Sequence, residues 1–364
     1  MRVDKLTLKD FTVFGGTEFD FSPGLNVLIG ANGTGKSHVL KVLYSITRTI
    51  AIMGRMVPEN PHLGVSVLLG EPILRELEKI FRPEPGPSPF TSLVRHGAHI
   101  ANVTAHGDFA SAAISFGVHG ANTDFAGFTP PRGSALAVFV PASEVLSIFP
   151  GFVAAYERRE LSFDGTFRDL CVDLSASLLR SIDSPVLADL LAKLDDAVGG
   201  KTVLRGDRFY VSVSEDWLLE APMLAEGLRK LASVAHLVRN GSLRQGSVLF
   251  WDEPETNLNP RLIPTVAHAL LALAAAGIQV FVATHDYLLT NEVSLMAEYG
   301  TTEATAAKPK PRFFCLSHAG PHEPVQVERG DTIADLQTNP ILEEFAAHYD
   351  REQKLFAERQ PSEE

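Results

Sequence analysis

The segment LNVLIGANGTGKSHVL, residues 25–40, decides the fold of this 364-residue chain. It begins with a continuously apolar run typical of a buried parallel strand, and it leads into a helix that we expect over residues 36–53. Between them, GANGTGKS (Gly30–Ser37) fits the pattern G-x-x-x-x-G-K-[ST], in which backbone N–H groups close around phosphates. A strand, this loop and a helix in direct succession predict a P-loop NTPase.

The loop residues predict ATP and Mg²⁺ as cofactors. The helix after the loop brings its positive end to the phosphates, Lys36 is expected to bridge the β- and γ-phosphates, and Ser37 to ligate Mg²⁺. The residues predicted to contact the nucleotide within one subunit are Gly30, Ala31, Asn32, Gly33, Thr34, Gly35, Lys36, Ser37 and His38.

Two further apolar strands end in polar side chains that suit phosphate chemistry. In SVLFWDEPETNLNP (247–260), Asp252 is expected to hold the Mg²⁺ shell, and Glu253 to polarise the attacking water. In QVFVATHDY (279–287), His285 follows the strand at the edge where parallel sheets bind ligands, and it could donate to a γ-phosphate. Glu253 and His285 are therefore the predicted catalytic residues.

These three motifs, in this order and spacing, resemble the ABC-type ATPase head, and more narrowly the SMC/RecF/OLD-like group. The similarity is specific over residues 1–54 and 220–290 and weak over the segment between them. It implies an α/β P-loop NTPase fold with a mixed sheet, an N-terminal antiparallel β-lobe and a helical signature subdomain. It also implies an ATP-dependent, head-to-tail homodimer in which one subunit's P-loop holds each ATP and the other's signature helix covers it.

The signature segment MLAEGLRKLA (Met223–Ala232) departs from the pattern of this family. Ala225 stands where the family has a serine that contacts the partner's γ-phosphate, a loss worth about 0.5–1.5 kcal/mol. Gly227 remains at the start of a helix whose N–H groups could still point at phosphate. We expect Ala225, Gly227 and, in the loop between the two sites, Asn257 to face nucleotide; the alternative is an ordinary amphipathic helix.

A second departure concerns the glutamine with which the family helps to ligate Mg²⁺. No glutamine precedes Gln245, and Glu144, just after the apolar run ALAVFVP (135–141), is the best substitute by position. A carboxylate there could bind Mg²⁺ directly or through water. The alternative is that Glu144 belongs to a helix-initiating cap with no role at the metal.

The remaining pattern predicts how the chain is organised. We expect a helix over 71–81, strand-like sequence over 98–116, loops at 82–90 and 117–134, a strand pair at 201–214, and two strands and a helix near the end. The expected segments are an N-terminal β-lobe with the P-loop (1–54), an inserted lobe (55–135), a helical subdomain with the strand pair (136–223), the signature-to-histidine segment (224–300) and C-terminal strands, helix and tail (301–364).

Composition narrows the classes of function. A net charge of −12, with basic residues only in short pairs, gives no indication of a nucleic-acid surface, although a local patch stays possible. No run of eighteen apolar residues occurs, so we expect no membrane segment and a cytosolic protein. Cys171 and Cys315, the two cysteines, suit a reducing compartment.

Three functional hypotheses remain. The favoured one is a slow ATPase that dimerises, possibly into higher oligomers, and controls a separate effector protein, a nuclease or toxin, in bacterial anti-phage defence or a toxin–antitoxin module. The second is a RecF-like DNA-repair ATPase. The third, the ATP subunit of a transporter, is disfavoured because such subunits normally keep the signature serine and the glutamine. No paired-acid motif follows Leu295, which argues against a nuclease within this chain.

Overall fold

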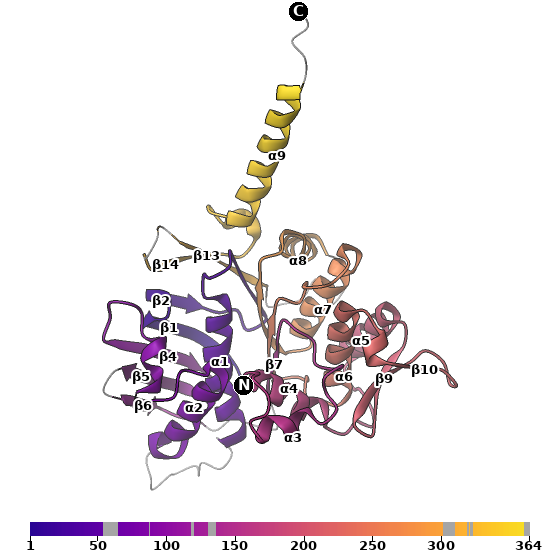
Figure 1. The fold of residues 1–364 in the computed structure, drawn as a ribbon, viewed down its shortest axis with the longest axis horizontal. Coiled ribbons are helices and arrows are strands. Elements are labelled where there is room, and N and C mark those ends of the chain that lie inside the picture. The colour runs from indigo at the N-terminus through magenta and orange to yellow at the C-terminus, as the bar shows by residue number, and fades with distance from the viewer. Residues whose placement is uncertain are drawn as a thin grey trace, which may run out of the picture.

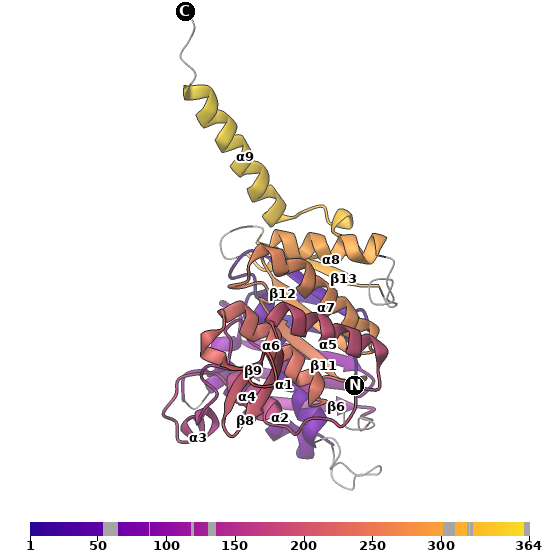
Figure 2. The same cartoon turned by 90° about the vertical axis from the view of Figure 1, so that its right-hand side faces the viewer.

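The computed structural model describes residues 1–53, 65–86, 88–117, 120–129, 136–300, 310–318, 320 and 323–359. A central sheet lies between the N-terminal sheet with α1 and α2 on one side and a group of helices on the other (Figures 1 and 2). Alternate residues of β3 show this division, since Val27 and Ile29 belong to the core on the helical side and Leu28 to the core under the N-terminal sheet.

The central sheet has six strands in the order β14-β13-β3-β12-β11-β7. Its strands are β3 (Leu25–Gly30), β7 (Ala137–Val140), β11 (Val248–Asp252), β12 (Gln279–Thr284), β13 (Arg312–His318) and β14 (Val325–Gly330). All neighbours pair in parallel except β14, which is antiparallel to β13. The predicted α/β fold with a mixed sheet is confirmed, and the carboxyl ends of β3, β11 and β12 meet at one edge.

The N-terminal sheet is antiparallel, with the order β2-β1-β4-β5-β6. Its strands are β1 (Val3–Phe11), β2 (Phe14–Asp20), β4 (Ile100–Gly107), β5 (Ala110–Gly117) and β6 (Gly120–Ala126). The segment that was expected to form an inserted lobe thus extends the sheet that β1 and β2 begin. The physical reason is that β1 pairs with β2 along one edge only, and β4 completes the hydrogen bonding of its other edge.

The predicted loop over 117–134 is wrong for Gly120–Ala126, which pairs with β5 as strand β6. Its side chains alternate only between exposed and half-exposed, so the apolar alternation that indicates a strand is missing. Backbone pairing at the edge of an existing sheet outweighs the weak strand propensity of its glycine and asparagine. Residues 118, 119 and 130–134 of this stretch lie outside the described residues.

Helices cover both faces of the central sheet. They are α1 (Lys36–Met53), α2 (Val65–Phe81), α3 (Phe152–Glu157), α4 (Gly165–Leu174), α5 (Pro185–Val198), α6 (Glu226–Arg239), α7 (Ile263–Ala275) and α8 (Tyr287–Tyr299), with short 3₁₀ turns at Pro89–Leu93, Ala221–Met223, Pro260–Leu262 and Ile333–Asp335. Helix α1 has the predicted bounds. Helix α2 begins at Val65, earlier than the predicted 71–81. Proline is favoured in the first turn of a helix, but Pro72 lies inside α2.

The predicted strand pair forms with a third strand. Strands β8 (Lys201–Arg205), β9 (Arg208–Ser212) and β10 (Leu218–Glu220) make a small antiparallel sheet beside α6. None of the helices in the described ranges is both long and apolar enough to cross a membrane.

The last described helix, α9 (Pro340–Arg359), projects from the body of the molecule (Figures 1 and 2). The sequence predicted that its apolar residues would pack on the head or on a partner. In the structure the ring of Phe345 lies tilted against that of Tyr287 of α8, with ring centroids 4.9 Å apart. The side chains of Leu342, Phe345 and Tyr349 nevertheless remain exposed. Packing on the head is therefore limited to the start of the helix.

Candidate functional site

The P-loop closes tightly between β3 and α1. The Lys36 ammonium donates to the carbonyl oxygens of Gly30 at 2.7 Å and Ala31 at 2.9 Å, and the Thr34 hydroxyl donates to Ala31 at 2.9 Å. Gly35 has φ of +87°, and a Cβ on it would lie 2.7 Å from a Val13 methyl. Glycine is therefore required there both by backbone conformation and by space. Burial lowers the pKa of Lys36, and nearby carboxylates, Glu253 first among them, oppose that shift.

Ser37 and Asp252, predicted to hold Mg²⁺, meet across two elements. The Ser37 hydroxyl at the start of α1 donates to Asp252 Oδ1 at the end of β11, at 3.1 Å. Burial raises the pKa of Asp252, and the hydrogen bond from Ser37 opposes that shift. A hydroxyl and a carboxylate are the hard oxygen donors that Mg²⁺ prefers, so this pair fits the ion. No cluster of three or more His, Cys, Asp or Glu side chains suited to a metal occurs in the described ranges.

Glu253 is held at both its backbone and its carboxylate. Its backbone has φ of +46°, unusual for a residue other than glycine, and its N–H donates to Ala283 of β12 at 2.9 Å. Its Oε2 accepts from the Thr256 hydroxyl at 3.1 Å, and its Oε1 lies 3.1 Å from His285 Nδ1. The two predicted catalytic residues are therefore in direct contact.

A second glutamate, Glu255, belongs to this group and was not predicted. Its Oε1 accepts from the Thr284 hydroxyl at 2.7 Å and from the backbone N–H of His285 at 3.4 Å, and it lies 3.8 Å from His285 Nδ1. Burial raises the pKa of Glu255. The signal in the sequence was the third acid of the segment WDEPE, two residues after Glu253.

The signature segment lies against the loop that follows β11. Ala225 is the N-cap residue of α6, and a Cβ on Gly227 would lie 2.6 Å from the carbonyl oxygen of Asn257. Lys230, one turn further and 1% exposed, donates to the carbonyl oxygens of Glu253 at 3.0 Å and Thr256 at 2.9 Å. The start of α6 is thus fixed to the backbone that carries the predicted general base.

Glu144 has partners other than the Mg²⁺ pair. Its Oε1 forms an ion pair with Arg229 Nε of α6 at 2.9 Å, and its carboxylate accepts from the backbone and the hydroxyl of Ser147. The surrounding residues form turns and not the start of a helix, so the alternative of a helix cap does not describe them. A role for Glu144 at the metal stays a prediction.

His38, predicted to contact nucleotide, lies half-buried with its ring 5.8 Å from that of Phe81. Burial lowers the pKa of His38, and Lys41 adds to that shift.

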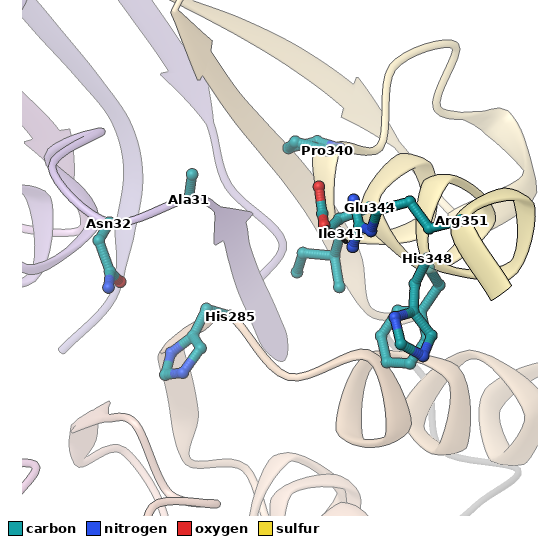
Figure 3. A pocket seen from close by; sticks show the side chains of 9 residues that line it. Ala31, Asn32, His285, Pro340, Ile341, Glu344, His348 and Arg351 are labelled. Carbon is teal, nitrogen blue, oxygen red and sulfur yellow. Dashed lines mark hydrogen bonds and ion pairs between the residues drawn. The ribbon is translucent and has the colours of Figure 1, made fainter. Parts of the chain in front are cut away.

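A cavity of about 490 Å³ opens beside the outer part of the P-loop (Figure 3). Ala31, Asn32 and His285 line it on the side of the central sheet, and the first turns of α9 line it on the other. The helix contributes Pro340, Ile341, Glu344, Phe345, His348 and Arg351. The structure thus brings three predicted site residues to one open space, which the C-terminal helix borders.

Two family models match the segments that carry these residues. Residues 5–44 match a model described as "AAA domain", and residues 150–291 match one described as "AAA domain, putative AbiEii toxin, Type IV TA system". The first covers the P-loop. The second covers the signature helix, Asp252, Glu253 and His285.

Relatives and solved structures point to the same class. The chain is 46% identical over 43 residues to the DNA double-strand break repair Rad50 ATPase of Thermococcus kodakarensis, and 41% identical over 46 residues to the DNA replication and repair protein RecF of Salmonella typhi. These matches cover 12% and 13% of this chain, and 5% and 13% of the relatives. The Smc head domain with an extended coiled coil from Pyrococcus furiosus, bound to the C-terminal domain of ScpA, superposes with a TM-score of 0.50 at 13% identity, covering 90% of this chain and 96% of that one.

The fold and the three strand-end motifs define an ATPase head of the ABC type. More narrowly, this chain has an SMC/RecF-like head, in which a mixed P-loop sheet is joined to an antiparallel N-terminal sheet.

Proposed function

We propose that this chain binds ATP with Mg²⁺, dimerises head-to-tail on ATP, hydrolyses it slowly and thereby switches a separate effector protein. The observation that carries the proposal is the meeting of Ser37, Asp252, Glu253 and His285 at one edge of the central sheet. These side chains come from three different segments of the chain. A hydroxyl, two carboxylates and an imidazole are the groups that phosphoryl transfer uses to hold Mg²⁺, polarise water and contact the γ-phosphate.

The roles of the protein's own groups follow from their contacts. Lys36, which donates to the carbonyl oxygens of Gly30 and Ala31, would contact the β- and γ-phosphates, and Ser37 and Asp252 would hold Mg²⁺. Bound Mg²⁺ supplies neutralisation of the developing phosphate charge. Glu253 polarises the attacking water, while Thr256 and the left-handed backbone keep its carboxylate at the end of β11.

Dimerisation places the start of one subunit's α6 over the other subunit's ATP. Ala225 is exposed, and the helix it precedes has no side-chain cap, so its first N–H groups are free to meet a phosphate. Because Lys230 ties this helix to the backbone of Glu253, binding at the partner's site is coupled to the position of the general base in the same subunit.

A toxin–antitoxin setting is supported by the matched family, whose description reads "putative AbiEii toxin, Type IV TA system". We propose anti-phage defence or a toxin–antitoxin module as the setting, with a nuclease or toxin as the effector. The second candidate is a RecF-like role on DNA, favoured by the Rad50 and RecF relatives. The net charge of −12 disfavours it.

Two measurements test the proposal. Purified protein should release phosphate from ATP only with Mg²⁺, and a protein without Mg²⁺-dependent hydrolysis would contradict the ATPase mechanism. Purification from native cells should recover a second protein with a nuclease or toxin fold. Recovery of DNA fragments without such a protein would instead favour the RecF-like role.

A further inference from the structure

Glu255 reaches the end of β12 at three points through one oxygen atom. Its Oε1 accepts from the Thr284 hydroxyl and from the backbone N–H of His285, and it lies 3.8 Å from His285 Nδ1. Thr284 in turn accepts from the backbone N–H of Asp286 at 2.9 Å. One carboxylate therefore fixes both the turn that carries His285 and the side of the ring that bears Nδ1.

The ring of His285 needs such support because its surroundings are open. The side chain is 46% exposed and borders the cavity beside Asn32. Within the described part of the chain, the ring forms ion pairs with Glu253 and Glu255. An exposed imidazole without a fixed partner rotates among several rotamers, so its orientation depends on these two carboxylates.

The two carboxylates are not equivalent. The Glu253 side chain is 28% exposed and is assigned to the attacking water, so its contacts change during the reaction. The Glu255 side chain is 6% exposed, and its contacts join the turn after β11 to the end of β12. Its Oε2 is buried without a hydrogen-bond partner among the described residues. Burying an unpaired carboxylate oxygen costs free energy, so packing alone does not account for a glutamate at this position.

We propose that Glu255 is the positioning residue of His285: it fixes the Thr284–His285 turn and keeps Nδ1 toward the carboxylates, so that Nε2 faces the γ-phosphate. The contact of His285 with the γ-phosphate rests on the proposed function, whereas the orientation of its ring by Glu255 does not. Glu255 itself is 6% exposed and acts through the turn and the ring of His285.

The kinetic test compares Glu255→Ala, His285→Ala and the double variant by steady-state ATP hydrolysis. Each single variant should lower kcat about 10- to 100-fold, the usual cost of losing a group that orients a functional side chain, with ADP affinity within about twofold of wild type. The double variant should be no slower than His285→Ala, because Glu255 acts through the ring. Losses that multiply in the double variant would overturn the proposal.

A second measurement is independent of hydrolysis. Long-range ¹H–¹⁵N correlation spectra of the nucleotide-free protein distinguish Nδ1–H from Nε2–H imidazole, and His285→Gln identifies the signal among the twelve histidines. His285 should be protonated at Nδ1 in wild type and a mixture of tautomers in Glu255→Ala. An unchanged tautomer would overturn the proposal. Absent hydrolysis with the expected tautomers would instead count against the proposed function alone.

Asp286→Ala is the matched control. Asp286 directly follows His285, but its side chain caps α8 by accepting from the backbone N–H of Leu289 at 2.6 Å and does not bond to the imidazole ring. The Asp286→Ala variant should have a lower Tm than wild type but the same His285 tautomer. If Asp286→Ala shifted the tautomer as much as Glu255→Ala does, local loosening would explain the effect and the specific role of Glu255 would be refuted.

Discussion

Ala225→Ser restores a hydroxyl to the position that faces the partner's nucleotide in the proposed dimer. Ala225 is the N-cap of α6 with φ of −59° and ψ of 144°, and no side chain caps the helix. A serine there should gain one hydrogen bond to phosphate per site, worth about 0.5–1.5 kcal/mol. Since a symmetric dimer has two sites, the total of about 1–3 kcal/mol predicts an ATP-bound dimer about 5- to 150-fold tighter.

The same substitution has a second effect that must be separated from the first. Serine is a good N-cap residue, so it should also raise the stability of the monomer by about 0.5–2 kcal/mol. Ala225→Asp is the matched control, because aspartate caps equally well but brings a negative charge to the partner's phosphates. Both variants should raise the Tm without nucleotide, while only Ala225→Ser should tighten the dimer and Ala225→Asp should weaken it.

The assay is sedimentation velocity over a dilution series with ATP, in the Glu253→Gln background so that hydrolysis does not deplete the ligand. If the substitutions acted only by capping α6, both would change the dimer dissociation constant in the same direction. If Ala225→Ser and Ala225→Asp shift the dimer constant equally, or neither shifts it, the start of α6 does not face a phosphate and the segment has only a structural role.

Three further predictions concern single side chains. Lys230→Met should lower the free energy of unfolding by about 2–4 kcal/mol, because two buried carbonyls lose their donor. Denaturant unfolding measures this loss, and an unchanged midpoint would show that Lys230 does not hold α6 to the loop after β11. Lys36→Ala should abolish ATP binding, and unchanged affinity by calorimetry would contradict the P-loop assignment. Burial, helped by the charge of Asp169, raises the pKa of Glu76 to about 7. The folded protein then binds the extra proton between about pH 4.5 and 7, so stability falls as the pH rises through this window, and Glu76→Gln should remove that fall. Urea unfolding at pH 5 and pH 8 checks it, and equal pH dependence of the two proteins would contradict it.

The segments proposed to bind nucleotide could be predicted from the sequence because their chemistry is local. The glycines of the P-loop, the apolar run before Asp252 and the strand before His285 each combine a strand signal with a polar end. Parallel strands bring such ends to one edge, so the contact between Glu253 and His285 follows from topology.

The parts that were missed depend on contacts between distant segments. Glu255 was passed over because the sequence does not show that the turn after β11 directs its side chain toward Thr284. The joining of β4 to β1 was missed since any free strand edge accepts a partner, and the order of strands is not encoded in either strand alone. Strand β6 carries no apolar alternation at all. Lys230 looks like a solvated helix residue in the sequence, yet the loop that crosses α6 buries it.

In the proposed mechanism ATP joins two copies of this chain, each covering the other's P-loop. Light scattering of Glu253→Gln tests it directly, with Lys36→Ala/Glu253→Gln as the control that cannot bind nucleotide. With ATP and Mg²⁺, Glu253→Gln should have twice the mass that it has with ADP, while the control keeps one mass in both. A Glu253→Gln protein that binds ATP by calorimetry but keeps the mass of a single chain would contradict the account.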